Sequence, residues 1–348
     1  MQRPFKEKCK KQLSGDGLKA SGCGSKYKFT ISSICANIRS VMELVITMVK
    51  VVICMALGFF LNKIKILSAD SNSVISRFIL NVTLPCTMFA AVAGMESRDM
   101  ATVWELILIG FAIYIFLGIA AFITSKLIRM GKESEGVVQC LLMFGNVSFL
   151  GIPLVQALYG DVGVFYNAVL NVHFNIFCFT YGVWLMAKHS EGGYKLNFKS
   201  FLSPCLISIV LALIIYLCGI TVPEIIMEPM EFIGQITSPL AMITIGSIIA
   251  TYSLKELFSQ GKLYILAALK MLIFPAIAYA ILYFTIGPGL ITNVVTIYMA
   301  MPTANTISMM AVTYKSDPKT ATYGTGLMNI LCILTIPLIY MLMQMLGS

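Results

Sequence analysis

Apolar runs close to 20 residues long recur along this chain of 348 residues. A run of that length forms a helix that can cross the roughly 30 Å hydrocarbon layer of a bilayer. Hydrophobic residues make up 58% of the sequence and charged residues only 12%, whereas a soluble globular chain carries about 25% charged residues. Because lipid offers no partner for unpaired backbone groups, helices are the expected elements. The sequence therefore predicts an all-α integral membrane protein.

The apolar runs predict ten transmembrane helices, and one polar connection divides them into two groups of five. The predicted spans are 43–62, 71–94, 102–128, 136–159, 162–187, 203–221, 231–252, 262–286, 289–314 and 320–346. The predicted domains are a tail over 1–41, a first five-helix repeat over 42–187, a cytoplasmic linker over 188–202 and a second repeat over 203–348.

The tail differs from everything that follows it. Residues 1–41 carry nine Lys and Arg against two acids, with several glycines. This composition cannot build a core, so we expect a basic, disordered segment. No adequate apolar run precedes Val45, which argues against a secretory signal peptide. Met42 stands directly before the first span and is an alternative start of the protein.

Loop charges predict the orientation of the ten-helix body. One set of alternating loops holds thirteen basic residues and the other set holds only Arg98. The basic set is Lys63, Lys65, Arg77, Lys126, Arg129, Lys132, Lys188, Lys195, Lys199, Lys255, Lys262, Lys315 and Lys319. Basic loops stay on the cytoplasmic side, so both ends of the body are predicted to be extracytoplasmic. The expected location is the plasma membrane, with several passes, although the basic tail conflicts with this orientation.

The charge and cysteine content exclude other classes of protein. The net charge of +9 resides in the tail and the short loops, as in cytoplasmic anchors, so no nucleic-acid partner is expected. The ten cysteines show no CxxC pair, and seven lie singly in apolar segments. They are typical of small apolar residues rather than of a disulfide framework or a metal site.

Five spans in each half require the second half to enter the membrane with the opposite orientation. Inverted repeats of this kind are typical of secondary transporters. Sequence echoes support the pairing of the two halves. Thr83-Leu84-Pro85 followed by Gly94 in the second span corresponds to Thr237-Ser238-Pro239 followed by Gly246 in the seventh.

Spans four and nine are each interrupted by helix-breaking residues. Span four holds Gly145-Asn146 and then Gly151-Ile152-Pro153, and span nine holds Met301-Pro302-Thr303-Ala304-Asn305. A proline removes a helical donor, and at membrane depth the freed carbonyls must face protein or water. Half-helix N-termini present free N–H groups that suit an anion. Prolines that only kink helices for packing are the alternative interpretation.

Six short stretches carry a family resemblance from residue 42 to the end. They are Leu57-Gly58-Phe59-Phe60-Leu61, Asn81-Val82-Thr83-Leu84-Pro85, Gly145 to Leu154, Ser238 to Gly246, Met301 to Asn305 and Thr335-Ile336-Pro337. In this order they resemble the auxin efflux carrier family, in its compact bacterial form without a long cytoplasmic loop. The resemblance implies two inverted five-helix repeats with crossing broken helices, and transport of organic anions such as auxin-like acids or dicarboxylates. Asn329 stands where the family would be expected to have a small hydroxyl residue.

Polar residues inside the spans are the candidates for substrate contact. The predicted substrate-binding residues are Asn81, Asn146, Gly151, Pro153, Asn171, Asn175, Pro302, Thr303 and Asn305. Asparagine can hold a carboxylate, but it can equally cap a half-helix or join two helices. Lys270 lies well inside span eight and has a structural and a substrate-binding interpretation.

No carboxylate lies in the middle of a span to carry a coupling ion. His173 is the one mid-span residue whose ordinary pKa lies near physiological pH, so it is the candidate for proton coupling. Its alternative is a neutral histidine bonded between helices. Sodium held by backbone carbonyls and Asn oxygens at the breaks is the other option. No cofactor and no metal site is expected.

The sequence favours a secondary carrier of small organic anions that works by alternating access. It carries no HExxH, GxSxG or Walker A pattern and no membrane-embedded catalytic pair, so it is not expected to be an enzyme. An ion channel or a solute-sensing receptor on the same scaffold is the alternative. The expected partners are the anion and the lipid bilayer, with a homodimer left open.

Overall fold

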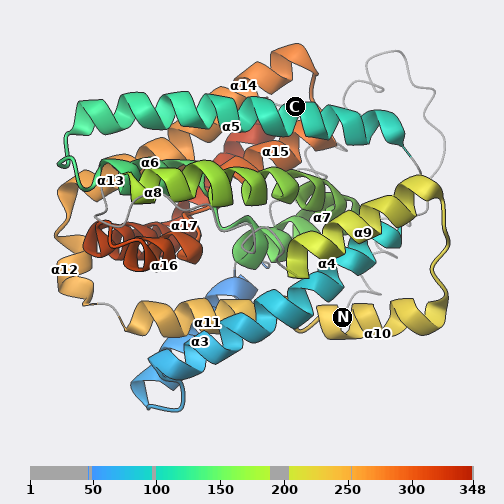
Figure 1. The fold of residues 1–348 in the computed structure, drawn as a ribbon, viewed down its shortest axis with the longest axis horizontal. Helices are drawn as coiled ribbons and strands as arrows, with labels where there is room; N and C mark the ends of the chain where they lie inside the picture. Colours follow the sequence, from blue (N-terminus) through green and yellow to red (C-terminus); the bar gives the residue numbers. More distant parts are fainter. Residues whose placement is uncertain (1–45, 47–48, 96–98, 189–203, 252, 347–348) are drawn as a thin grey trace, which may run out of the picture. The chain divides into compact units, whose positions relative to one another are not determined.

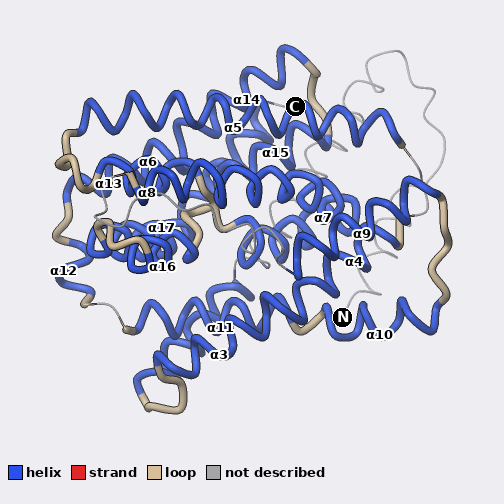
Figure 2. Tube along the Cα trace, in the orientation of Figure 1, coloured by secondary structure: helices blue, strands red, loops and turns tan. Residues whose placement is uncertain are grey.

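A computed structural model describes residues 46, 49–95, 99–188, 204–251 and 253–346. The predicted tail (1–41) and nearly all of the linker (188–202) lie outside the described residues. Throughout the described ranges the regular elements are helices (Figure 2), and the one strand-like pairing is an isolated bridge between Gly145 and Thr303. The prediction of an all-helical protein is confirmed.

The elements follow one another as helices joined by short turns. In the first half, after a helix over residues 49–63, they are α3 (Ala69–Phe78), η1 (Ile79–Thr83), α4 (Leu84–Ala93), α5 (Met100–Ile128), α6 (Glu135–Met143), η2 (Val147–Gly151), α7 (Ile152–Phe177), η3 (Cys178–Gly182) and α8 (Val183–Ala187). In the second half they are α9 (Pro204–Cys218), α10 (Glu224–Gly234), α11 (Thr237–Ala250), α12 (Leu254–Phe258), α13 (Gly261–Ala268), η5 (Leu269–Ile273), α14 (Phe274–Thr285), α15 (Leu290–Ala300), α16 (Asn305–Thr313) and α17 (Pro318–Leu346).

Six described helical stretches are long and apolar enough to cross a bilayer. They are Ala69–Ala93, Met100–Ile128, Val147–Ala187, Glu224–Ala250, Gly261–Thr285 and Pro318–Leu346. Two shorter apolar helices are Pro204–Cys218 and Leu290–Ala300. The chain is therefore a multi-pass membrane protein. Helix occupies part of each of the ten predicted ranges, while the arrangement as ten spans in two inverted repeats stays a prediction.

Three π-helical turns end two residues before a proline: η1 before Pro85, η2 before Pro153 and η5 before Pro275. A proline has no N–H to give the preceding turn, and a widened turn lets other backbone groups take up the freed carbonyls. The helix therefore continues through Pro153, which stands in the first turn of α7. The prediction that Gly151-Ile152-Pro153 interrupts span four was wrong, and the interruption is confined to the residues around Gly145.

Gly160 marks the predicted turn between spans four and five. Its φ of 64° and ψ of −156° are far from helical values, yet α7 continues on both sides. Only glycine adopts this backbone region without a steric penalty. The chain thus changes direction at one residue, and the second half of span four and all of span five form one kinked stretch.

Close packing joins helices from the two halves. A Cβ added at Gly58 would overlap the carbonyl oxygen of Ile243 in α11, and one added at Gly246 would overlap the carbonyl oxygen of Met55. A second contact between the halves joins α4 and α9, where the Ser208 hydroxyl donates to the carbonyl oxygen of Pro85 at 2.6 Å. Figure 1 shows α11 beside α3 as well, and α4 beside α9. In each pair a helix early in one half contacts a helix early in the other.

Large apolar side chains divide between the core and the outer surface. On α5, Leu106, Ile113 and Leu117 are buried, while Trp104 and Leu108 are exposed. A helix that is apolar all round suits a location between protein and lipid. An acidic residue at the start of α5 fits this location between protein and lipid, because it lies just outside the apolar segment. Asp99 caps α5, and hydrogen bonds from Thr102 lower the pKa of its carboxyl group.

Candidate functional site

The two helix breaks lie against each other. α6 ends at Met143 and α15 ends at Ala300, and the residues that follow are extended. The backbone N–H of Asn146 donates to the Pro302 carbonyl at 2.6 Å, and that of Ala304 donates to the Phe144 carbonyl at 3.0 Å. This antiparallel pairing, centred on Gly145 and Thr303, satisfies backbone groups that the interrupted helices leave open. The two broken helices therefore meet at their breaks, as expected.

A cavity of about 370 Å³ adjoins the paired breaks. It is lined by Leu80, Asn81, Leu84, Gly145, Asn146, Val147, Ser148, Phe149, Asn171, Phe174, Asn175, Phe179, Val183, Pro204, Cys205, Ala304, Asn305, Thr306, Met309, Met310, Thr313 and Tyr314. None of these lining residues is acidic or basic. The wall combines apolar and aromatic side chains with amides and hydroxyls, which is the usual composition of a small-molecule site.

Five of the predicted substrate-binding residues line this cavity: Asn81, Asn146, Asn171, Asn175 and Asn305. The sequence left open whether these asparagines share one site, and the fold brings them together from α7, η1 and the two breaks.

The other four predicted substrate-binding residues are not among the lining residues. Pro302 and Thr303 lie in the second break and are buried there, and the Thr303 hydroxyl donates to the Leu141 carbonyl at 2.6 Å. Gly151 and Pro153 lie at the junction of η2 and α7. Their positions favour a structural role in the crossover, the place where the two broken helices meet.

Two helix N-termini meet the cavity. η2 begins at Val147 and α16 begins at Asn305, and Ser148 and Thr306 also line the wall. The first N–H groups of a helix have no acceptor within it, and its N-terminus carries about half a positive charge. The side chain of Asn146 accepts from the N–H of Phe149 at 3.2 Å and so caps η2. The other backbone N–H groups at these two N-termini give this wall the character of an anion-binding surface.

A chain of amides orders one side of the wall. Asn175 Nδ2 donates to Asn171 Oδ1 at 2.7 Å and to the Asn171 carbonyl at 2.8 Å. Asn171 Nδ2 in turn donates to the Ser148 hydroxyl oxygen at 2.7 Å. Because Ser148 accepts this bond, its own O–H proton is left to donate elsewhere. The chain directs hydrogen-bond donors toward the start of η2.

Asn305 is held by a residue of α17. Asn329 Nδ2 donates to Asn305 Oδ1 at 3.2 Å and to the Thr325 carbonyl at 2.9 Å. The carbonyl end of the Asn305 amide is thereby engaged, so its NH₂ end is the part left for a ligand. Asn329, which departs from the family's expected hydroxyl residue, positions this amide.

Sequence reasoning missed Asn167, which is buried behind the first break. Its Nδ2 donates to the Val147 carbonyl at 3.1 Å. Asn167, Asn171 and Asn175 follow one another at intervals of four, so they share one face of α7. That interval was the signal that could have revealed Asn167.

His173, the candidate for proton coupling, does not line the cavity. It is buried against α5, where the Phe111 ring meets the imidazole edge-on with 4.8 Å between the ring centroids. A Cβ added at Gly110 would overlap the imidazole. Among the described residues its Nδ1 has no hydrogen-bond partner. The part of the chain that the structure describes also contains no cluster of His, Cys, Asp or Glu suited to a metal ion.

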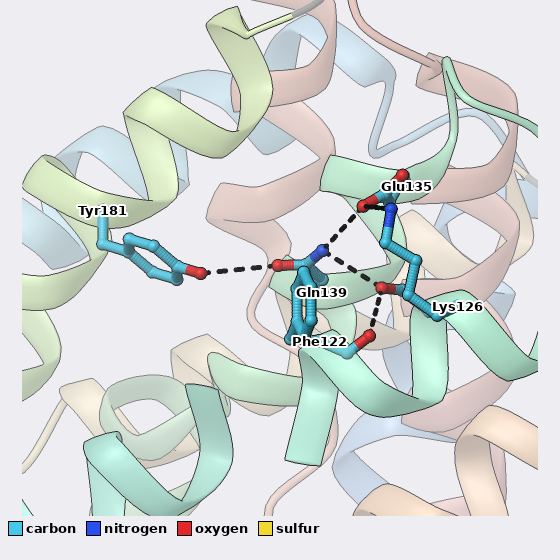
Figure 3. A network of polar contacts seen from close by, with 6 residues as sticks. Phe122, Lys126, Glu135, Gln139 and Tyr181 are labelled. Carbon is cyan, nitrogen blue, oxygen red and sulfur yellow. Dashed lines mark hydrogen bonds and ion pairs between the residues drawn. The ribbon is translucent and has the colours of Figure 1, made fainter. Parts of the chain in front are cut away.

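A polar network fixes the first turn of α6. Gln139 is buried between α5 and η3, and its Nε2 donates to the Ser125 hydroxyl at 3.1 Å. Glu135 pairs with Lys126 at 2.8 Å, and Tyr181 donates to Gln139 Oε1 at 3.5 Å (Figure 3). These contacts join α6 to α5 and η3 and so anchor the half-helix that leads into the first break.

Apolar membrane-length helices, two paired helix breaks and an amide-lined cavity define a polytopic membrane protein with a candidate solute site at discontinuous helices. The chain belongs to the membrane transport protein family, whose sequence profile matches residues 43–340. This match confirms the resemblance to the auxin efflux carriers.

Relatives with similar sequences are also transporters by name. An uncharacterised transporter of Methanocaldococcus jannaschii is 22% identical over 275 residues, which is 77% of this chain and 89% of that protein. One of Methanothermobacter thermautotrophicus is 23% identical over 304 residues, 84% of this chain and 96% of that protein. The uncharacterised transporter YfdV of Escherichia coli is 22% identical over 213 residues, 58% of this chain and 67% of that protein.

Proposed function

We propose that this membrane transport protein is a secondary carrier of small organic anions. The observation that carries the proposal is the cavity where two helix N-termini and several amide donors converge and where none of the described lining residues is acidic. An anion there would gain from the helix dipoles and from N–H donors, and a carboxylate has acceptor oxygens for them. The cavity's volume of about 370 Å³ suits a small carboxylic acid.

Alternating access is the proposed mechanism, and a second cavity supports it. This cavity, of about 260 Å³, is lined by residues along α4 from Thr87 onward and by Gly94 just after it, together with Gln156, Asp161 and Glu231. α4 therefore borders one cavity near its start and another near its end. Movement of the broken helices along α4 would connect the anion with one side of the membrane at a time.

The coupling ion is part of the same proposal. Uptake against an inside-negative potential needs a co-transported cation, whereas export of an anion is favoured by that potential. A proton would require a titrating group, for which His173 remains the proposed carrier. Sodium would instead be held by carbonyl and Asn oxygens at the breaks.

The test of the proposed function is uptake by the purified full chain in proteoliposomes. Radiolabelled succinate, malate, benzoate and indole-3-acetate are offered, with protein-free vesicles as the control. We expect saturable uptake of at least one acid, and faster uptake when the same unlabelled acid is inside. Flux that never saturates and shows no such counterflow would indicate a channel. Absence of uptake for every acid, in vesicles shown to hold folded protein, would contradict the anion assignment.

The orientation is proposed from the loop charges, and thiol labelling tests it. Single cysteines at Lys195 should be shielded from an impermeant reagent added outside intact cells, because that position is predicted to be cytoplasmic. Cysteines at Pro223 or Gly289 should react. Permeabilised cells, in which all three positions should react, provide the control. The opposite labelling pattern would overturn both the orientation and the inverted-repeat assignment.

A further inference from the structure

Lys270 is a buried lysine at the crossover. Its side chain is 1% exposed, and Nζ lies 3.4 Å from the carbonyl oxygen of Met143, the last residue of α6. Among the described residues it is the one Lys, Arg, Asp or Glu that is buried. Its ammonium has three donors, and an ammonium in such a place is unfavourable unless something compensates it. A lysine in a membrane-spanning segment is unfavourable toward lipid, so its presence at this position indicates a role at the neighbouring site.

The elements packed against η5 offer Lys270 no carboxylate. They are α6, α13, α14, α15 and α17. Their one carboxylate is Glu135, which starts α6 at the end opposite Met143 and pairs with Lys126 at 2.8 Å. The buried titratable side chains on these elements are Cys140, Tyr279, Tyr298, Cys332 and Tyr340. The position of Lys270 is thus one where a positive charge has no described counter-ion.

The electrostatics of the crossover give this charge a role. The N-termini of η2 and α16 meet there, and so do the C-termini of α6 and α15. Each end carries about half a unit of charge, so the two negative ends offset part of the positive potential that the two N-termini give the cavity wall. The lining residues that the structure describes add no charged side chain. One ammonium at the end of α6 would offset the negative end nearest to it and so strengthen the positive potential at the cavity wall.

We propose that Lys270, in its ammonium form, supplies a counter-charge that strengthens anion selection at this site, acting from behind the first break without touching the substrate. This inference rests on the proposed anion-carrier function. Gly145, which lines the cavity, follows Met143 by two residues, so the amine lies on the order of 10 Å from the wall. At that distance in a partly dehydrated site, one charge changes anion affinity on the order of tenfold.

The opposing possibility is that Lys270 only caps the last carbonyl of α6. The two roles predict opposite effects on stability when the charge is removed. Loss of a mere cap destabilises the fold, because the Met143 carbonyl is left without its donor. Removal of an uncompensated buried charge by an apolar side chain of similar length is neutral or stabilising. Stability and anion affinity measured together therefore separate them.

The test compares the full-length wild type with Lys270→Met in detergent. Thermal unfolding is followed in sodium succinate, malate, benzoate and indole-3-acetate, each against sodium chloride of equal ionic strength. We expect at least one acid to raise the wild-type midpoint saturably, and Lys270→Met to need about tenfold more of it. Without acid, Lys270→Met should unfold at or above the wild-type temperature. Lys262→Met is the matched control, because that exposed lysine also donates to a backbone carbonyl, at 3.1 Å from Arg129.

Each other outcome has a defined meaning. If Lys270→Met keeps the wild-type acid dependence at any unfolding temperature, or unfolds below the wild type with a weakened dependence that Lys270→Arg shares, Lys270 is structural and the inference is overturned while the carrier function stands. If no acid shifts the wild type, the anion assignment itself fails and takes the inference with it. Lys270→Arg keeps the charge and should keep the acid dependence. Should Lys270→Met not fold, Lys270→Gln replaces it in the same comparison.

Discussion

Asn305→Asp is expected to reduce carboxylate uptake at least about a hundredfold without loss of folded protein. Asn305 is the first residue of α16 and lines the cavity. Aspartate has the same shape and is favourable in the first turn of a helix, so the local fold should persist. It can also keep the hydrogen bond that Asn329 donates. Two like charges about 4 Å apart repel by about 4 kcal/mol at an effective dielectric constant near 20. That energy corresponds to more than about a hundredfold loss of affinity for the carboxylate.

The measurement is the initial rate of uptake in proteoliposomes at pH 7.5, where the introduced carboxyl group is ionised, with the acid that the wild type transports best. Asn293→Asp is the matched control, because Asn293 also lies near the start of a helix, α15, but does not line the cavity. It should transport like the wild type. Unchanged kinetic constants for Asn305→Asp would mean that the anion binds away from the second break.

Gly58→Ala and Gly246→Ala are each expected to destabilise the protein by more than about 2 kcal/mol. A Cβ at either position would overlap a backbone carbonyl oxygen of the facing helix, that of Ile243 or of Met55. A backbone atom cannot rotate away as a side chain can, so the two helices would have to separate, and overpacking of this kind is destabilising. The double variant should lose less than the sum of the two single losses, because the first substitution already separates the helices.

Thermal unfolding in detergent measures this effect, and Gly118→Ala is the control. Gly118 lies inside α5, and an added Cβ would have as its nearest neighbour the end of Met143 at 3.6 Å, an ordinary contact. Alanine there should be neutral or stabilising by about 0.5–1 kcal/mol, as in any helix interior. If Gly58→Ala unfolds at the same temperature as Gly118→Ala, the helix over residues 49–63 does not pack closely on α11.

Much of the candidate site could be predicted because it depends on local rules. Asn171 and Asn175 are four residues apart, so helical geometry alone puts them on one face. Asn146 and Asn305 flank residues that cannot continue a helix. Pro153 was misinterpreted because its position within the helix was not visible. It stands in the first turn of α7, directly after the π-helical turn η2, where a proline is tolerated, and the preceding sequence gives no sign of that turn.

Lys270 shows where local rules end. The sequence placed it inside a span, but two roles remained open because nothing nearby in the chain specifies its partner. That partner is the Met143 carbonyl, which belongs to the other half of the chain. Asn329 is similar: its departure from the family pattern was visible, but its contact with Asn305 required the packing of α17 against α16.

By itself, the sequence determined that this protein is helical, lies in a membrane, belongs to a transport family and has two interrupted helices. Each of these follows from composition, run length or short motifs, because the bilayer imposes the same demand on every segment separately. Tertiary structure alone decided which backbone groups pair at the two interruptions, which asparagines face one cavity and which helix end Lys270 meets. These depend on contacts such as that between Asn146 and Pro302, which join the two halves. The periodicity of one helix specifies which face is polar, but not which distant backbone group that face will meet.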